Sequence, residues 1–127
     1  MSQITNTIFM IRPVSFRSNE QTIINNFYQK NNSNFDLSLI NKKALLEFDV
    51  FVKKLKSKGI NVIVIDDNEN YDTPDSIFPN NWISFHSDGK TVLYPMFAKN
   101  RRLERREDIL DYLTNQYGFK INSIKDY

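Results

Sequence analysis

The stretch Pro74–Trp82 carries most of the side chains of this sequence that could bind a small polar ligand. It contains the carboxylate of Asp75, the ring of Phe78 and the amide pair Asn80 and Asn81. A carboxylate accepts both N–H groups of a planar guanidinium or ureido group in a bidentate fork, and an aromatic ring covers its plane. The amides offer carbonyl acceptors to N–H groups and N–H donors to an oxygen. The pattern is therefore typical of a guanidinium or ureido binding site, although the same residue types also cap and turn ordinary loops.

The catalytic repertoire of the chain is small. There is no cysteine, and the single histidine is His86. A thiolate nucleophile, a disulfide framework and a thiolate metal site are therefore excluded. A Ser/His/Asp triad or a multi-histidine metal site has almost nothing to build on. We expect no catalytic residue, no metal and no cofactor in this chain, and interpret His86 as a surface or half-buried strand residue.

Length, charge and hydropathy limit the number of domains, the kinds of partner and the location that we expect. With 127 residues the chain holds one domain at most, and a net charge of +2 predicts neither a nucleic-acid nor a membrane partner. The basic residues of 101–106 are interleaved with acidic ones, as on a solvated helix. The apolar run Ile8–Ile11 is too short for a signal peptide, and no stretch reaches the roughly 20 apolar residues of a membrane span. We expect a cytoplasmic protein.

Hydrophobic periodicity predicts an α/β fold. Leu45, Phe48, Val52 and Leu55 recur at helical spacing, whereas Ile60–Ile65 is almost entirely apolar and typical of a strand buried on both faces. The dipeptide Asp-Gly at 88–89 predicts a β-hairpin turn. The expected elements are a strand at 8–11, a helical turn within 20–29, a helix at 41–58, a strand at 60–65, a hairpin of 82–86 with 91–94, a helix at 103–117 and a strand at 119–124.

The order of these elements is repeated. A strand, a loop containing arginine, a helix, a glycine and a second strand occur first up to Ile65 and then again, with Gly59 and Gly118 at corresponding places. Repeats of this size bury their apolar faces against neighbouring copies and usually need three or more of them. The sequence therefore predicts part of a repeat array. The alternative is that βαβ-like units recur in any α/β protein.

Two longer motifs resemble one family. They are Asp-Ser-Ile-Phe-Pro-Asn-Asn-Trp-Ile-Ser-Phe-His at 75–86 and Leu-Tyr-Pro-Met-Phe-Ala-Lys-Asn-Arg-Arg-Leu-Glu-Arg-Arg at 93–106, preceded by Met-Ile-Arg-Pro at 10–13. Together they resemble the amidinotransferase/arginine deiminase superfamily, and within it most closely the citrulline utilization hydrolases. The family fold is the pentein, a five-bladed α/β propeller of ββαβ units. The resemblance implies that residues 1–127 are the N-terminal part of a pentein domain, about two units of five.

The resemblance also implies roles for individual residues. Members of the family hydrolyse C–N bonds of arginine-like substrates. Asp75 is similar to the carboxylate that grips the substrate nitrogens, and Arg101 to the arginine that pairs with the substrate α-carboxylate. Asn80 and Asn81 stand where other branches have acidic residues, which favours a neutral ureido group, as in citrulline, over a guanidinium. The alternative for Arg101 is surface charge at the start of a helix.

The same comparison implies what the chain does not contain. Phe16 and Arg17 lie where the family has a mobile lid loop. The nucleophilic cysteine and the general-base histidine of the family lie in its second half, so we expect no activity from this chain alone. Its expected partners are a citrulline- or arginine-like amino acid and either a complementary C-terminal half or a second copy. The alternative is a non-catalytic α/β module that binds a small ligand or protein through the loop at 75–82.

Overall fold

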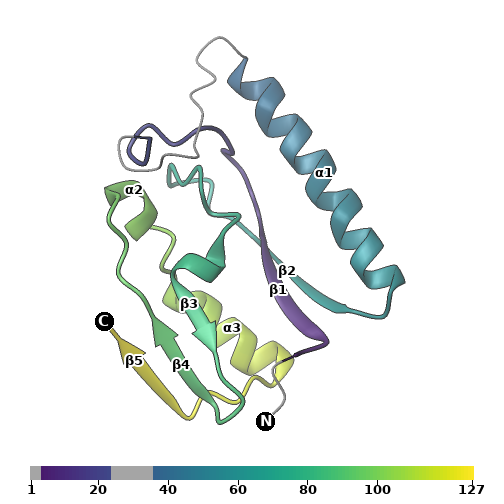
Figure 1. Ribbon diagram of the computed structural model, residues 1–127, viewed down its shortest axis with the longest axis vertical. Helices are drawn as coiled ribbons and strands as arrows, with labels where there is room; N and C mark the ends of the chain where they lie inside the picture. Colours follow the sequence, from purple (N-terminus) through teal and green to yellow (C-terminus); the bar gives the residue numbers. More distant parts are fainter. Residues whose placement is uncertain (1–3, 24–35) are drawn as a thin grey trace. The chain divides into compact units, whose positions relative to one another are not determined.

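The computed structural model describes residues 4–23 and 36–127 and has a mixed α/β fold (Figure 1). The chain divides into two compact units, Met1–Phe78 and Pro79–Tyr127. Within the described residues the elements are β1 (Thr7–Arg12), α1 (Leu37–Ser57), β2 (Asn61–Asp66), the 3₁₀ turn η1 (Pro79–Asn81), β3 (Ile83–Phe85), β4 (Lys90–Leu93), α2 (Lys99–Arg102), α3 (Glu107–Tyr117) and β5 (Ser123–Asp126).

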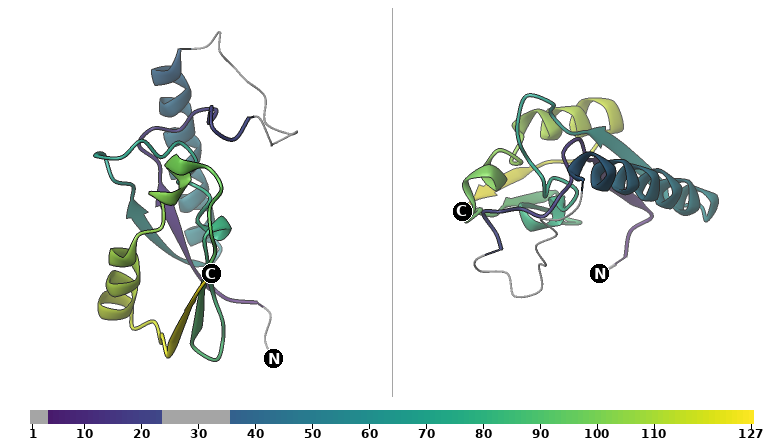
Figure 2. Two further views of the ribbon diagram at one scale, coloured as in Figure 1. Left: turned by 90° about the vertical axis from the view of Figure 1, so that its left-hand side faces the viewer. Right: turned by 90° about the horizontal axis from the view of Figure 1, so that it is seen from above.

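The first unit is a β–α–β arrangement. Strands β1 and β2 pair in parallel, with Ile8 opposite Val62, and α1 lies beside them (Figures 1 and 2). Phe48 and Val52 of α1 are buried against Val62, as the helical periodicity predicts. Ile63 is buried as well, with 2% of its surface exposed. Since neighbouring residues of a strand point to opposite faces, β2 is covered on both faces, which confirms the expectation for this apolar run.

Helix α1 is longer at its start than the sequence pattern predicts. It begins at Leu37 instead of residue 41, because the side chain of Asp36 caps it by accepting a hydrogen bond from the Ser38 amide at 2.9 Å. At the other end the Ile60 amide donates to the Leu55 carbonyl and Gly59 has a φ of 83°, so the predicted glycine stop is confirmed. In the described part of the chain, no helix combines the length and apolar composition of a membrane span.

The second unit is built on the predicted hairpin. β3 and β4 are antiparallel, and β5 pairs with β4 in parallel. Successive residues alternate between the two faces of this sheet. Leu93 of β4 lines a pocket together with Leu110 of α3 and Trp82. Helix α3 therefore lies on the face of the sheet to which Leu93 points. Trp82 is 1% exposed.

Two boundaries predicted in the second unit are wrong. The helix expected at 103–117 starts only at Glu107, the separate short helix α2 ends before it, and Leu103 between the two, expected to face inward, is 43% exposed. The last strand starts at Ser123 instead of residue 119. Phe119 packs edge-on against Phe85 of the hairpin, with ring centroids 5.4 Å apart, and the Asn122 amide donates to the Gly89 carbonyl at 2.8 Å. These contacts hold 119–122 as a connection beside the hairpin turn.

The structure contains two parallel β–α–β successions, as a repeat would require, and their origin as copies of one unit stays a prediction. β1, α1 and β2 form one parallel β–α–β succession, and β4, α3 and β5 form another. When β3, which precedes β4 in the sequence, is included, the second succession has the order ββαβ. A mixed α/β fold of small sheets is compatible with part of a pentein, whereas the propeller arrangement stays a prediction. Of the turn expected within 20–29, residues 20–23 form a turn and the rest lies outside the described residues.

Candidate functional site

The loop that follows β2 holds Asp75 in an ordered turn. The hydroxyl of Thr73 donates to the Asp67 carboxylate at 2.7 Å, and both residues are buried. The Ser76 amide then donates to the Thr73 carbonyl, and the Phe78 amide to the Asp75 carbonyl. Successive turns of this kind fix the backbone on both sides of Asp75. The predicted carboxylate therefore sits on a well-defined loop and is half-buried.

A buried amide contacts the Asp75 carboxylate. Asn19 has no exposed surface, and its Nδ2 donates to Asp75 Oδ2 at 2.8 Å. Its Oδ1 accepts from the Gln21 amide at 3.0 Å. A polar side chain that is fully buried normally has hydrogen-bond partners on both sides, and Asn19 does. The segment after β1 is thereby joined to the loop after β2.

Arg17, expected in a lid, makes a second link between the same two segments. Its Nη1 and Nη2 donate to the two carboxylate oxygens of Asp72 at 2.7 and 2.8 Å. Its Nε and Nη2 donate to Glu20 at 3.0 and 3.2 Å. These bonds raise the pKa of Arg17 and lower the pKa values of Asp72 and Glu20 below their ordinary ranges.

Phe16, the other predicted lid residue, is fixed through its backbone. Its amide donates to Asn41 Oδ1 of α1 at 2.9 Å, and Asn41 Nδ2 donates to the Val14 carbonyl at 2.8 Å. The Phe16 side chain is half-buried. That these residues act as a lid stays a prediction.

In the second unit, two predicted residues that are 20 positions apart meet. Arg101 Nη1 donates to Asn81 Oδ1 at 3.0 Å. On its other edge, Arg101 Nε and Nη2 donate to the two carboxylate oxygens of Glu104 at 3.1 and 3.0 Å. The Glu104 side chain is 1% exposed and that of Arg101 is 14% exposed. Arg101 is therefore held in a fixed plane and is not a loose surface charge.

The remaining predicted binding residues, Phe78 and Asn80, lie close to Asn81 in the sequence. Phe78 is 44% exposed, and Asn80 is exposed within η1. Asp75 and Phe78 belong to the first unit, whereas Asn80, Asn81 and Arg101 belong to the second. Convergence of both groups on one ligand stays a prediction.

The comparisons with known proteins indicate a family for the chain. A family model described as N,N dimethylarginine dimethylhydrolase, eukaryotic, matches residues 12–127. The chain belongs to the dimethylarginine dimethylhydrolase family. This match supports the predicted superfamily of enzymes acting on guanidino groups, while the citrulline-hydrolase branch and the status of an N-terminal half stay predictions. No curated protein and no solved structure matches the chain.

The hydrogen-bonded groups around Asp75 and around Arg101 both lie inside the stretch that the dimethylarginine dimethylhydrolase model covers. Two of their members, Asn19 and Glu104, were not predicted from the sequence. Glu104 follows Arg101 at the i,i+3 spacing of helical ion pairs, which was a usable signal. Asn19 lies in a polar stretch without periodicity, and nothing in the sequence distinguishes it from its neighbours. In residues 4–23 and 36–127 no group of three or more acidic or histidine side chains could hold a metal ion.

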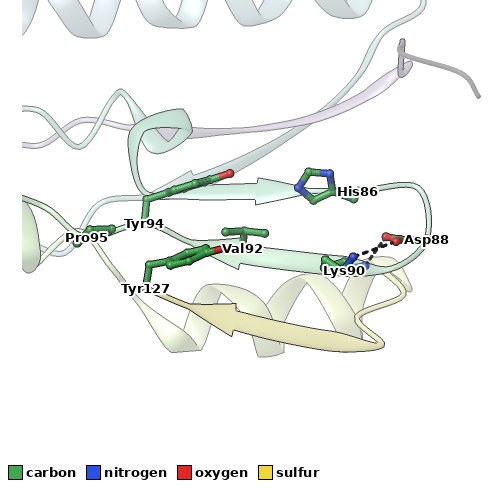
Figure 3. Close-up of a pocket in the computed structure, with 7 residues that line it drawn as sticks. All are labelled: His86, Asp88, Lys90, Val92, Tyr94, Pro95 and Tyr127. Atoms are coloured by element: carbon green, nitrogen blue, oxygen red, sulfur yellow. Dashed lines mark hydrogen bonds and ion pairs between the residues drawn. The ribbon is translucent and has the colours of Figure 1, made fainter.

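His86 lies on the hairpin of the second unit, directly after β3. It is exposed beside the hairpin turn, and its Nε2 is 3.1 Å from Ser84 Oγ, which is 3.0 Å from the Tyr94 hydroxyl. His86 and Tyr94 border an open depression of about 590 Å³. In Figure 3, Tyr94 and Tyr127 stand at one end of it and His86 with Lys90 at the other. The depression contains none of the residues predicted to bind substrate.

Proposed function

We propose that this chain supplies the substrate-binding half of a hydrolase that cleaves C–N bonds of ureido or guanidino amino acids. Its substrate class is citrulline-like. The nucleophilic cysteine and the base come from a complementary C-terminal half, because the sequence itself has no cysteine. The chain alone binds its ligand and does not hydrolyse it.

The contact between Arg101 and Asn81 carries this proposal. A guanidinium has only N–H donors, so the atom of Asn81 that faces it must be the carbonyl oxygen, as the 3.0 Å bond requires. Asn81 then presents its Nδ2 donors to a ligand. A ureido group has a carbonyl oxygen to accept them, whereas a guanidinium has no acceptor. The fixed orientation of Asn81 thus favours citrulline over arginine.

Arg101 is suited to take the α-carboxylate of such a ligand. The bidentate contact with Glu104 fixes the guanidinium plane in advance. Less side-chain freedom is therefore lost when a ligand carboxylate binds. In the first unit, Asp75 supplies an acceptor for the ligand N–H groups, and Phe78 supplies an exposed ring.

The substrate class is tested by Asn81→Asp, which replaces the amide donor by an isosteric acceptor. We expect the affinity for L-citrulline to fall about tenfold, as for loss of one good hydrogen bond, and that for L-arginine to rise. Isothermal titration calorimetry with both amino acids measures the ratio. Asn70→Asp adds the same charge to an exposed loop position and is the matched control. An unchanged citrulline-to-arginine ratio in Asn81→Asp contradicts the assignment.

The α-carboxylate contact is tested by Arg101→Ala, with Lys99→Ala as the control. Lys99 is an exposed residue of the same short helix, so both variants lose one positive charge. We expect citrulline affinity to fall at least tenfold in Arg101→Ala only. Ammonia release measured on the same samples should equal that of a buffer blank. Equal losses in both variants would indicate a nonspecific charge effect, and ammonia release would overturn the division into halves.

The alternative function is a non-catalytic module, and the open depression beside His86 favours it. The depression lies outside the predicted substrate residues and offers two tyrosine rings to a ligand. A ligand bound there would be insensitive to Asn81→Asp and sensitive to Tyr94→Ala. The two functions are separated by these variants.

A further inference from the structure

We infer that Asn19 is a positioning residue that orients the Asp75 carboxylate for the ligand and couples it to the segment after β1. The inference deepens the proposed function and rests on it, because Asp75 must be a ligand-binding group for its orientation to matter. Asn19 lies 56 residues from Asp75 in the sequence and is joined to it directly in space.

The contacts of the Asn19 side chain with Asp75 and Gln21 leave one orientation for its amide. The Asp75 carboxylate accepts hydrogen bonds, so the Nδ2 of Asn19 must face it, at 2.8 Å. The Gln21 amide donates, so Oδ1 must face that group, at 3.0 Å. Reversing the amide would break both bonds. Because Asn19 has no exposed surface, water cannot replace either partner.

The backbone around Asn19 is as firmly held as its side chain. Its carbonyl accepts hydrogen bonds from the amides of Thr22 and Ile23 and from the Thr22 hydroxyl. Two residues earlier, Arg17 grips Asp72, three positions before Asp75, through two hydrogen bonds. Two links therefore connect the segments, and any displacement of residues 17–19 is passed to the loop that carries Asp75.

Few other side chains would serve at position 19. Serine is too short to reach both partners, and alanine leaves the Gln21 amide and the Asp75 carboxylate without this bond. An aspartate has the same shape but places a second carboxylate against Asp75. Two carboxylates at that distance share a proton at low pH and repel one another once it is lost. The amide therefore holds Asp75 without adding negative charge, which suits a neutral ureido ligand.

The test measures L-citrulline affinity by calorimetry in the full 127-residue chain. Asn19→Ala should lower the affinity about tenfold, and it should have no further effect in an Asp75→Ala background. Asn19→Asp keeps the shape, and its citrulline affinity should fall as pH rises from about 5 to 8, while that of the wild type stays level. Asn41→Ala is the matched control, because it removes an amide that ties the same segment to α1 without touching Asp75.

The outcomes separate this inference from the proposed function. Failure of the wild-type chain to bind citrulline overturns the proposed function and the positioning role with it. Citrulline binding that is equally strong in wild type and Asn19→Ala overturns the positioning role alone. The same follows if Asn41→Ala loses as much affinity as Asn19→Ala, since the effect would then be general loosening. If Asn19→Ala does not fold, a level pH profile in Asn19→Asp is the overturning result.

Discussion

Arginine side chains organise the polar clusters of both units at the scale of single residues. Arg17 holds Asp72 and Glu20, and Arg101 holds Asn81 and Glu104. Each guanidinium uses its planar fork to fix acceptors from different parts of the sequence. Residue types alone indicated that Asp75 could bind a ligand, whereas the role of Arg101 was implied by the resemblance of residues 93–106 to the amidinotransferase/arginine deiminase superfamily. The contact of Asp75 with Asn19 could not be predicted, because a hydrogen bond between residues 56 positions apart leaves no local pattern.

The Arg17–Asp72 pair makes stability depend on acidity. Its hydrogen bonds lower the pKa of Asp72 in the folded state, so the pair stabilises the fold above the ordinary aspartate pKa of about 3.9 and stops doing so as pH falls through the lower folded value. We expect Asp72→Asn to lower the free energy of unfolding by up to about 1 kcal/mol at pH 7, since the Asp72 side chain is 62% exposed.

Urea unfolding followed by circular dichroism at pH 7 and at about pH 2.5 measures this effect. The difference between wild type and Asp72→Asn should shrink at the lower pH. Glu69→Gln, an exposed position in the same loop, is the control for simple charge loss. A constant difference at both pH values would show that the pair does not titrate as described.

At the scale of elements, helix α1 decides whether the first unit is stable. Phe48 is 4% exposed and packs in the cluster with Val52 and Val62, whereas Phe51 on the same helix is 51% exposed. Removing a buried ring leaves a cavity as well as losing its transfer free energy. We expect Phe48→Ala to cost about 3–5 kcal/mol of unfolding free energy and Phe51→Ala less than about 1 kcal/mol. Urea titrations of both variants test this, and similar costs would contradict the packing of α1 on β2.

Periodic apolar residues predicted the existence of the elements better than their ends. The strand at 60–65 was predictable from its continuous apolar run, and the hairpin from its Asp-Gly turn, because both signals are local in the sequence. The break between α2 and α3 was not, because Leu103 and Leu110, seven positions apart, are compatible with one continuous helical stripe. The break follows from polar contacts of Arg101 with Glu104 and of Arg102 with the Met96 and Phe97 carbonyls. These contacts join residues only three to six positions apart, but they are polar and leave no trace in the apolar periodicity.

At the scale of the whole chain, the question is which apolar surface is left for a partner. A part of a propeller is expected to offer the runs Ile60–Ile65 and Phe119–Ile124 to the missing units. Most side chains of β2 are buried, and the exposed apolar side chains of the first unit lie on α1. On α1, Leu39, Leu46 and Val50 are at least half exposed on the side away from Phe48. In the second unit Ile124 of β5 is 53% exposed.

These side chains lead us to expect that the isolated chain associates with itself until a complementary half is supplied. Leaving an apolar stripe of a helix exposed to water costs about 25 cal/mol per Å² relative to burying it. Exposed strand edges also tend to pair with other chains. Sedimentation velocity should show a rise in mean mass between about 5 and 200 µM, and the melting temperature should rise with concentration. The double variant Leu46→Gln, Val50→Gln should sediment as a lighter species at the same concentration. Leu37→Gln, also exposed and at the start of α1, is the control and should behave as wild type. A wild-type chain that stays monomeric over this range, with a melting temperature independent of concentration, would mean that the 127 residues close their own surface and need no second half.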